Sequence, residues 1–131
     1  MVLVDTSVLI AYLKGIEQRA TIKLQSILDS GIPYGINSFI YQEALQGVQT
    51  RAAFQKLKAY LDTQTFYRLA DERESFAQAA QLYLECRKKQ ITVNSTIDFL
   101  IAQTAIENHL ALLHHDRDFE KIAQVCDLKF L

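Results

Sequence analysis

The chain has 131 residues, of which 50 % are hydrophobic and 22 % are charged, and its formal net charge is −1. This length suits one domain spanning residues 1–131 with a substantial hydrophobic core, and the composition excludes a disordered chain. It also excludes a protein whose overall positive charge drives nucleic-acid binding, so any such contact must be a local patch.

The first half of the chain alternates short aliphatic runs with amphipathic stretches. In chain order we expect a strand at 2–4, helices at 8–13 and about 17–30, a strand at 33–36, helices at 38–47 and 50–61, and a strand at 65–69. Gly15 and Gly31 are expected to end the first two helices, because glycine is the usual residue just after a helix. The first strand and helix are joined directly at Asp5.

The second half continues the alternation. In chain order we expect a helix from Asp71 to the basic triplet 87–89, a connector at 91–95, a helix from 97 to about 109, a strand at 111–113, a last helix with apolar positions from Phe119 to Cys126, and an edge strand at 128–131. Strands that alternate with helices predict an α/β fold, a three-layer sandwich in which helices flank a central, mainly parallel sheet.

The cysteines and the N-terminal residues indicate where the protein resides. Cys86 and Cys126 lack the spacing of a zinc site or a disulfide framework, so we expect two buried free thiols. The first residues have no basic segment followed by a long apolar one, and no window approaches about eighteen consecutive apolar residues. We therefore expect a soluble cytoplasmic protein with no membrane segment.

Four acidic residues occupy positions that favour a shared site. Asp5 and Asp116 each follow a predicted strand, where parallel sheets bind their ligands. Asp98 lies in the first turn of the helix before the 111–113 strand, which places it at the same sheet edge. Glu43 lies within the apolar stripe of its helix, so its charge needs a partner.

Each acid also has a structural interpretation. Asp5 is a suitable cap for the first helix, and Asp98 completes a Ser-x-x-Asp capping pattern that begins at residue 95. Asp116 or Asp118 is a suitable cap for the last helix, and Glu43 would be a surface residue if its helix were rotated. The shared sheet edge nevertheless favours a functional cluster.

The electrostatics of such a cluster point to a cation. Two carboxylates about 4 Å apart repel by about 4 kcal/mol at an effective dielectric near 20. Protonation or a bound cation must hold the cluster together, and at least one of the acids should have a raised pKa. Oxygen ligands without suitable Cys or His residues favour Mg²⁺ or Mn²⁺ over zinc. This chemistry suits hydrolysis of a nucleic-acid phosphodiester.

Four motifs carry a resemblance that spans the whole chain. They are Val-Leu-Val-Asp5-Thr6-Ser7-Val-Leu-Ile, Ser38-Phe-Ile-Tyr-Gln-Glu43, Thr96-Ile-Asp98-Phe-Leu-Ile-Ala and Leu112-Leu-His-His-Asp116-Arg-Asp118-Phe. Their order and spacing resemble those of PIN-domain nucleases and, among these, the VapC toxins of bacterial toxin–antitoxin pairs. Ser7 stands where many relatives carry Asn.

The resemblance implies both a site and an activity. Its metal-binding and catalytic acids would be Asp5, Glu43, Asp98 and Asp116, with Asp118 as an additional metal ligand. It also implies that Thr6 or Ser7 supports Asp5 by hydrogen bonding, and that the fold is PIN-like. The implied protein is an Mg²⁺- or Mn²⁺-dependent endoribonuclease, a homodimer, and the target of a small VapB-like antitoxin that inserts a segment near the active site.

Basic and histidine residues near these motifs have two interpretations. The candidates for RNA contact are Arg87, Lys88, Lys89 and Arg117. A basic helix terminus is also typical of a solvated surface. For His114 and His115 we favour a strand end with one ring packed and the other solvated.

Two alternatives to a ribonuclease stay open at this point. A degenerate PIN-like module would bind RNA or protein without cutting, but such a protein is expected to have lost acids. An aspartate after the first strand also begins the haloacid-dehalogenase phosphatase motif. That chemistry needs a second Asp two residues later, where this chain has Ser7.

Overall fold

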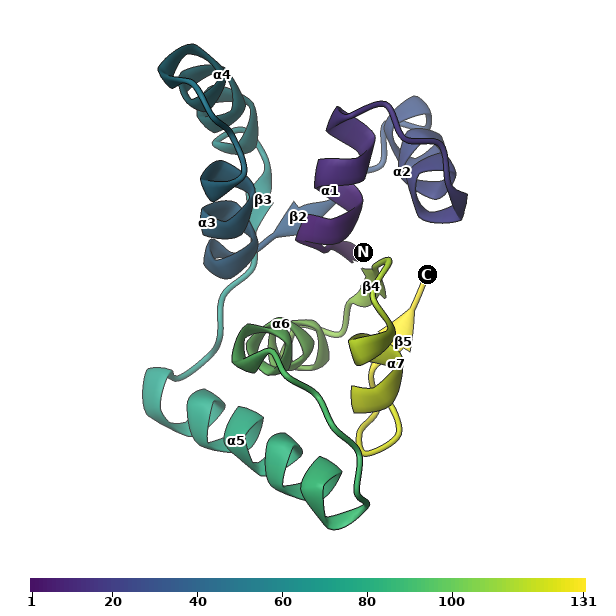
Figure 1. The fold of residues 1–131 in the computed structure, drawn as a ribbon, viewed down its shortest axis with the longest axis vertical. Helices are drawn as coiled ribbons and strands as arrows, with labels where there is room; N and C mark the ends of the chain where they lie inside the picture. Colours follow the sequence, from purple (N-terminus) through teal and green to yellow (C-terminus); the bar gives the residue numbers. More distant parts are fainter.

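The computed structural model describes all residues from Met1 to Leu131, in which seven helices and five strands alternate (Figure 1). The strands are β1 (Val2–Val4), β2 (Gly35–Ile36), β3 (Thr65–Phe66), β4 (Ala111–Leu113) and β5 (Lys129–Phe130). The helices are α1 (Thr6–Leu13), α2 (Arg19–Asp29), α3 (Ser38–Gln46), α4 (Arg51–Leu61), α5 (Glu72–Lys88), α6 (Thr96–Glu107) and α7 (Arg117–Ile122).

The five strands form one sheet in the order β3-β2-β1-β4-β5, and every neighbouring pair is parallel. In Figure 1, α1 and α2 lie above the strands, α5, α6 and α7 lie below them, and α3 and α4 form the arm at the left. The predicted α/β fold with helices flanking a parallel sheet is confirmed. The chain winds outward from β1 to β3 and then from β4 to β5, so the direction reverses between β1 and β4, where such sheets open a crevice.

Local sequence signals explain where the helices begin and end. The Asn37 and Thr50 side chains accept hydrogen bonds from backbone N–H groups in the first turns of α3 and α4, and Asp71 does so for α5. After α2, Gly31 has a φ of +68°, in the left-handed region that glycine adopts without strain. Gly31 therefore follows the end of α2 and stops this helix, as expected.

The core is built on β1, β4 and α6. Residues 98–105 of α6 are all buried, and so are the three residues of β1. Asn37 is also buried, and its side-chain amide donates a hydrogen bond of 3.1 Å to the Thr104 hydroxyl, linking α3 to α6. None of the helices combines the length and apolar character needed to cross a membrane.

Two elements end three or more residues earlier than the sequence predicts. The last helix ends at Ile122, because Gln124 and Val125 donate to carbonyls three residues back and turn the chain toward β5. Cys126 therefore lies in this turn and is only half-buried, whereas Cys86 is buried as expected. Strand β3 stops at Phe66 instead of residue 69, since the Arg68 carbonyl accepts a hydrogen bond from Asn108 after α6.

Replacing Asn37 by alanine should lower the free energy of unfolding by about 2 kcal/mol, because both the helix cap and the buried bond to Thr104 are lost. Urea denaturation measures this effect. Thr50→Ala is the matched control, since Thr50 caps α4 at an exposed position and should cost only about 1 kcal/mol. Equal losses in the two variants would contradict a role for the link between α3 and α6.

Candidate active site

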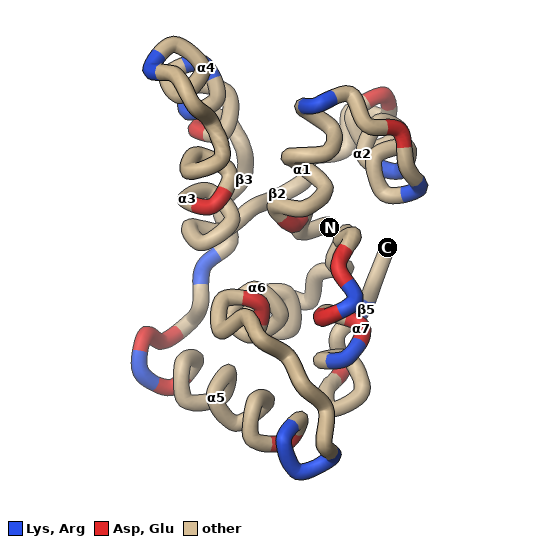
Figure 2. The backbone as a smooth tube through the Cα atoms, viewed as in Figure 1, with Lys and Arg blue, Asp and Glu red and all other residues tan.

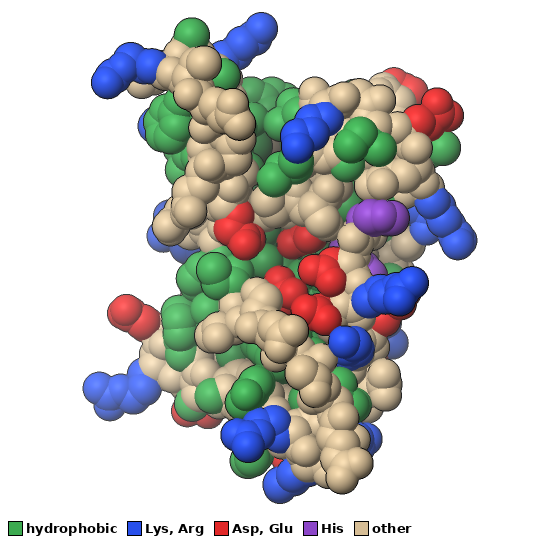
Figure 3. All heavy atoms as spheres, in the orientation of Figure 1, with side chains coloured by type: hydrophobic (Ala, Val, Ile, Leu, Met, Phe, Trp, Pro, Cys, Tyr) green, Lys and Arg blue, Asp and Glu red, His purple; other side chains and the backbone are tan.

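The five acidic residues singled out in the sequence converge from four segments of the chain. Asp5 follows β1, Asp116 follows β4, and Glu43 lies in α3. Asp98 and Asp118 lie in the first turns of α6 and α7. Figure 2 shows acidic positions on several elements near the middle of the molecule. Figure 3 shows their side chains along a hollow between the upper and lower halves, with histidine and basic side chains at its right-hand edge.

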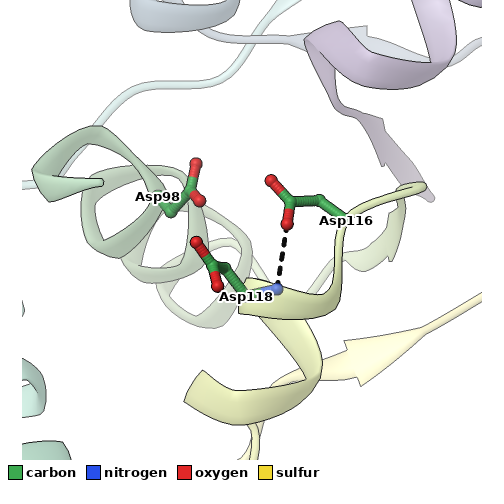
Figure 4. A group of neighbouring side chains, drawn as sticks. All are labelled: Asp98, Asp116 and Asp118. Carbon is green, nitrogen blue, oxygen red and sulfur yellow. Dashed lines mark hydrogen bonds between the residues drawn. The ribbon is translucent and has the colours of Figure 1, made fainter. Parts of the chain in front are cut away.

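Three carboxylates form the tightest group. Asp98, Asp116 and Asp118 each present an oxygen, and these oxygens lie within 4.8 Å of one another (Figure 4). Asp116 Oδ1 accepts a hydrogen bond of 2.9 Å from the Asp118 backbone N–H. The buried Asp98 Oδ2 has no hydrogen-bond partner. A buried oxygen without a donor is costly, so it indicates that a further group belongs there.

Asp5 and Glu43 are held beside this group by hydroxyl donors. Ser7 donates to Asp5 Oδ2 twice, from its hydroxyl at 2.6 Å and from its backbone N–H at 3.1 Å. The Ser7 hydroxyl also accepts a hydrogen bond of 3.1 Å from the His115 backbone N–H, which ties the start of α1 to the loop after β4. The Thr6 hydroxyl donates to Glu43 Oε1 at 3.0 Å rather than to Asp5.

Helix capping uses only some of the carboxylate oxygens of these acids. Asp5 and Asp116 are the N-caps of α1 and α7, and in each the hydrogen bonds of the cap engage a single carboxylate oxygen. At α6 the Ser95 hydroxyl accepts from the Asp98 backbone N–H, while the Asp98 side chain makes no reciprocal bond. Capping therefore does not account for the inward position of the Asp98 carboxylate.

The pKa values of three acids are raised, in agreement with the predicted repulsion. Burial, followed by the charges of Asp5 and Asp116, raises the pKa of Asp98 to about 7. Burial raises the pKa of Asp5, against the opposing effect of its Ser7 hydrogen bonds. Burial and the charge of Asp5 likewise raise the pKa of Glu43, although Thr6 opposes this. Oxygen ligands of this kind suit a hard divalent cation.

The two histidines after β4 have different surroundings. The His114 ring lies against Phe119 and Phe130, with centroid distances of 5.3 and 4.5 Å, and its Nδ1 accepts a hydrogen bond of 3.1 Å from the Asp116 backbone N–H. His115 is exposed. The arrangement agrees with one packed and one solvated ring, and it gives His114 a part in holding the Asp116 loop.

The basic candidates for RNA contact fall in two places. Arg117 follows Asp116 directly, beside the acidic cluster. The triplet 87–89 lies at the C-terminal end of α5, at the bottom of Figure 1, where Lys88 pairs with Glu85 at 3.5 Å. The Arg87 guanidinium lies 5.8 Å from the centre of the Tyr83 ring. These local partners favour a structural interpretation of the triplet.

Sequence reasoning missed Asn37, which positions the helix that carries Glu43. Its amide spans from the α3 cap to Thr104 in α6, so it fixes Glu43 relative to the helix of Asp98. The residue type and its place before a helix are typical of a cap. Its burial and its partner 67 positions along the chain could not be seen in the sequence.

Comparisons with known proteins agree with this fold. The model of the PIN domain family matches residues 2–125. A VapC ribonuclease of Mycobacterium bovis and ribonuclease VapC11 of Mycobacterium tuberculosis are each 28% identical to this chain, covering 98% of it and 96% of the relative. Among solved structures, VapBC-1 of nontypeable Haemophilus influenzae has a TM-score of 0.73 at 16% identity, covering 100% of this chain and 97% of the other. VapBC2 of Rickettsia felis, bound to promoter DNA, has a TM-score of 0.70 at 16% identity and covers 100% and 98%.

Replacing Asp98 by asparagine should stabilise the metal-free protein near neutral pH. The folded protein keeps the Asp98 proton up to about pH 7, whereas the unfolded chain releases it near 3.8, so folding loses stability as pH rises between these values. The asparagine side chain cannot ionise, and the gain at neutral pH should be on the order of a few kcal/mol. Urea denaturation with a chelator, as a function of pH, measures it.

The exposed Asp29→Asn variant serves as the control and should show no such pH-dependent gain. A destabilising effect of Asp98→Asn at neutral pH would contradict the raised pKa.

Proposed function

The chain belongs to the PIN domain family, and from that premise we propose that it is a divalent-metal-dependent endoribonuclease that acts as the toxin of a toxin–antitoxin pair. One observation carries the proposal: the carboxylates of Asp98, Asp116 and Asp118 meet at the crevice of the sheet with Asp5 and Glu43 close by, and a buried oxygen of Asp98 has no hydrogen-bond donor. The mycobacterial relatives are named as ribonucleases, which favours RNA as the substrate.

The donor set fits Mg²⁺ or Mn²⁺. All of the converging side-chain ligands are carboxylate oxygens, and Asp98 Oδ2 is buried without a hydrogen-bond partner. We propose that Asp98, Asp116 and Asp118 hold the cation, with Asp5 and Glu43 completing the acidic site. When bound, the cation would lower the pKa of a coordinated water and neutralise charge on the phosphodiester.

The protein's own residues would hold and orient these ligands. Ser7 fixes one oxygen of Asp5 and leaves the other available, and Thr6 does the same for Glu43. Such supporting hydrogen bonds commonly affect metal affinity about 10- to 100-fold. Asp98, which keeps its proton up to about pH 7, would release it when the cation binds, so cleavage should increase as pH rises through this range.

The alternative of a silent RNA- or protein-binding module predicts binding without cleavage. The complete set of acids favours the enzyme, because charge repulsion in the cluster makes it unfavourable to keep these residues for structure alone. An RNA cleavage assay separates the two.

Asp116→Asn and Asp98→Asn should each lower Mg²⁺-dependent cleavage of single-stranded RNA by at least about 100-fold, because a ligand and its charge are lost. Asp29→Asn, at an exposed position in α2, is the matched control and should cleave at the wild-type rate. Gel analysis of a labelled RNA with Mg²⁺, Mn²⁺ or a chelator measures the rates. Equal activity of all variants, or activity that survives the chelator, would falsify the proposal.

We further propose that a VapB-like antitoxin docks in an apolar groove beside α1. The solved neighbours are described as VapBC, and a groove of about 620 Å³ lies between α1, α2 and α4, lined by hydrophobic residues except for Lys56. Figure 3 shows the apolar surface in the hollow between the two upper arms. This shape and chemistry suit the apolar face of an amphipathic helix.

Leu13→Glu should weaken binding of a VapB-like antitoxin by about tenfold or more, since it places a charge in an apolar interface. Leu13 lines the groove yet is 54% exposed, so the fold should tolerate the change. Ile22→Glu is the control, because Ile22 is 52% exposed but lies outside the groove. Isothermal titration calorimetry measures the affinities, and equal binding by both variants would locate the antitoxin elsewhere.

The homodimer and the cytoplasmic location expected from the sequence belong to the same proposal. The homodimer follows from the resemblance to VapC toxins, and the cytoplasmic location follows from the cysteines and the N-terminal residues. Sedimentation of the purified chain, with and without the antitoxin, checks the dimer.

A further inference from the structure

A second hollow adjoins the acidic cluster and shares Asp116 with it. Its volume is about 550 Å³, within the range of small-ligand sites. It lies at the carboxyl ends of β4 and β5, and side chains of α2 and α7 form its other walls. Apart from Asp116, none of the residues that line this cavity has a part in the proposed cleavage chemistry.

Three cationic side chains line the cavity. Arg19 and Lys23 come from α2, and Arg117 comes from α7. The Lys23 ammonium donates a hydrogen bond of 2.7 Å to the Leu131 carbonyl, whereas neither arginine has an ion-pair partner. The facing carboxylates are Asp116 and Glu120. In a chain with a net charge of −1, three cationic side chains against two carboxylates give this cavity a local excess of positive charge, beside the proposed site for a polyanion.

Aromatic rings form another wall. Phe130 lines the cavity and is 38% exposed, and its ring lies 4.5 Å from that of His114, centre to centre. His114 in turn accepts a hydrogen bond from the Asp116 backbone N–H. A planar group stacked on Phe130 would therefore be held in a fixed relation to Asp116.

We propose that this cavity binds one nucleotide of single-stranded RNA next to the scissile phosphate. Arg19 and Arg117 contact its phosphates, and its base stacks on Phe130. A duplex keeps its bases inside the helix, so only an unpaired nucleotide can place its base in the cavity. The inference rests on the proposed ribonuclease function and adds the residues that select the substrate.

The first test is binding of a short, labelled, single-stranded oligoribonucleotide to the whole protein in a chelator, followed by fluorescence anisotropy. Arg19→Ala and Arg117→Ala should each weaken binding by about threefold to tenfold and flatten the salt dependence by about 0.7 per lost phosphate contact. Phe130→Leu should weaken it about tenfold with the salt dependence unchanged, and Phe130→Tyr should restore binding.

Arg73→Ala is the matched control, because Arg73 is an exposed residue at the start of α5, outside the cavity. It should bind like the wild type. Thermal unfolding checks that every variant is folded. Equal binding of an RNA duplex and the single strand overturns the assignment to an unpaired nucleotide.

Cleavage kinetics with Mg²⁺ separate this inference from the proposed function. Arg19→Ala and Phe130→Leu should raise KM with little change in kcat, because they hold substrate without touching the reacting atoms. If cleavage needs Asp98 and Asp116 but the cavity variants change neither KM nor RNA binding, the cavity does not bind the nucleotide. The proposed ribonuclease activity is then unaffected. If RNA binding depends on the cavity residues but the wild type does not cleave RNA, the proposed ribonuclease activity is rejected instead.

Discussion

The parallel pairing of β1 with β4 is the constraint on which the rest of the structure depends. Val4 pairs with Leu113, and the ladder continues when the Asp5 backbone N–H donates to the Leu113 carbonyl at 2.9 Å. Both strands therefore end together, and an acid follows each of them: Asp5 comes directly after β1, and Asp116 comes three residues after Leu113, the last residue of β4. Because the winding of the sheet reverses between these two strands, no crossover helix covers their ends, and the crevice stays open to substrate.

Bringing these acids together has an electrostatic cost that the surrounding polar groups offset only in part. The Ser7 hydroxyl is central, since it donates to Asp5 and accepts from the loop that carries Asp116. Thr6 supports Glu43 in the same way. No donor reaches the buried oxygen of Asp98, whose pKa is raised to about 7. The acids are therefore already in place for the proposed cation, which would limit the rearrangement needed on binding.

The same sheet edge places opposite charges side by side. The acidic cluster suits a cation and repels RNA, whereas the adjoining cavity presents Arg19 and Arg117 beside an aromatic wall. Under the proposed function, the cavity would hold a polyanion while its scissile bond lies over the acids. This separation would allow a chain without an overall positive charge to act on a nucleic acid. Changes to Arg19 or Phe130 would then alter substrate choice without altering the proposed metal ligands.

The sequence alone determined the alternation of strands and helices, since hydrophobic periodicity and helix caps are local signals. It also indicated the acids, because Asp5 directly follows one predicted strand and Asp116 follows another after two histidines. Only the tertiary structure decided that Thr6 serves Glu43, that Asn37 joins α3 to α6, and that Arg19 and Phe130 meet beside Asp116. These partners lie far apart in the chain, and their contacts depend on strand order and helix packing, which leave no periodic pattern in the sequence.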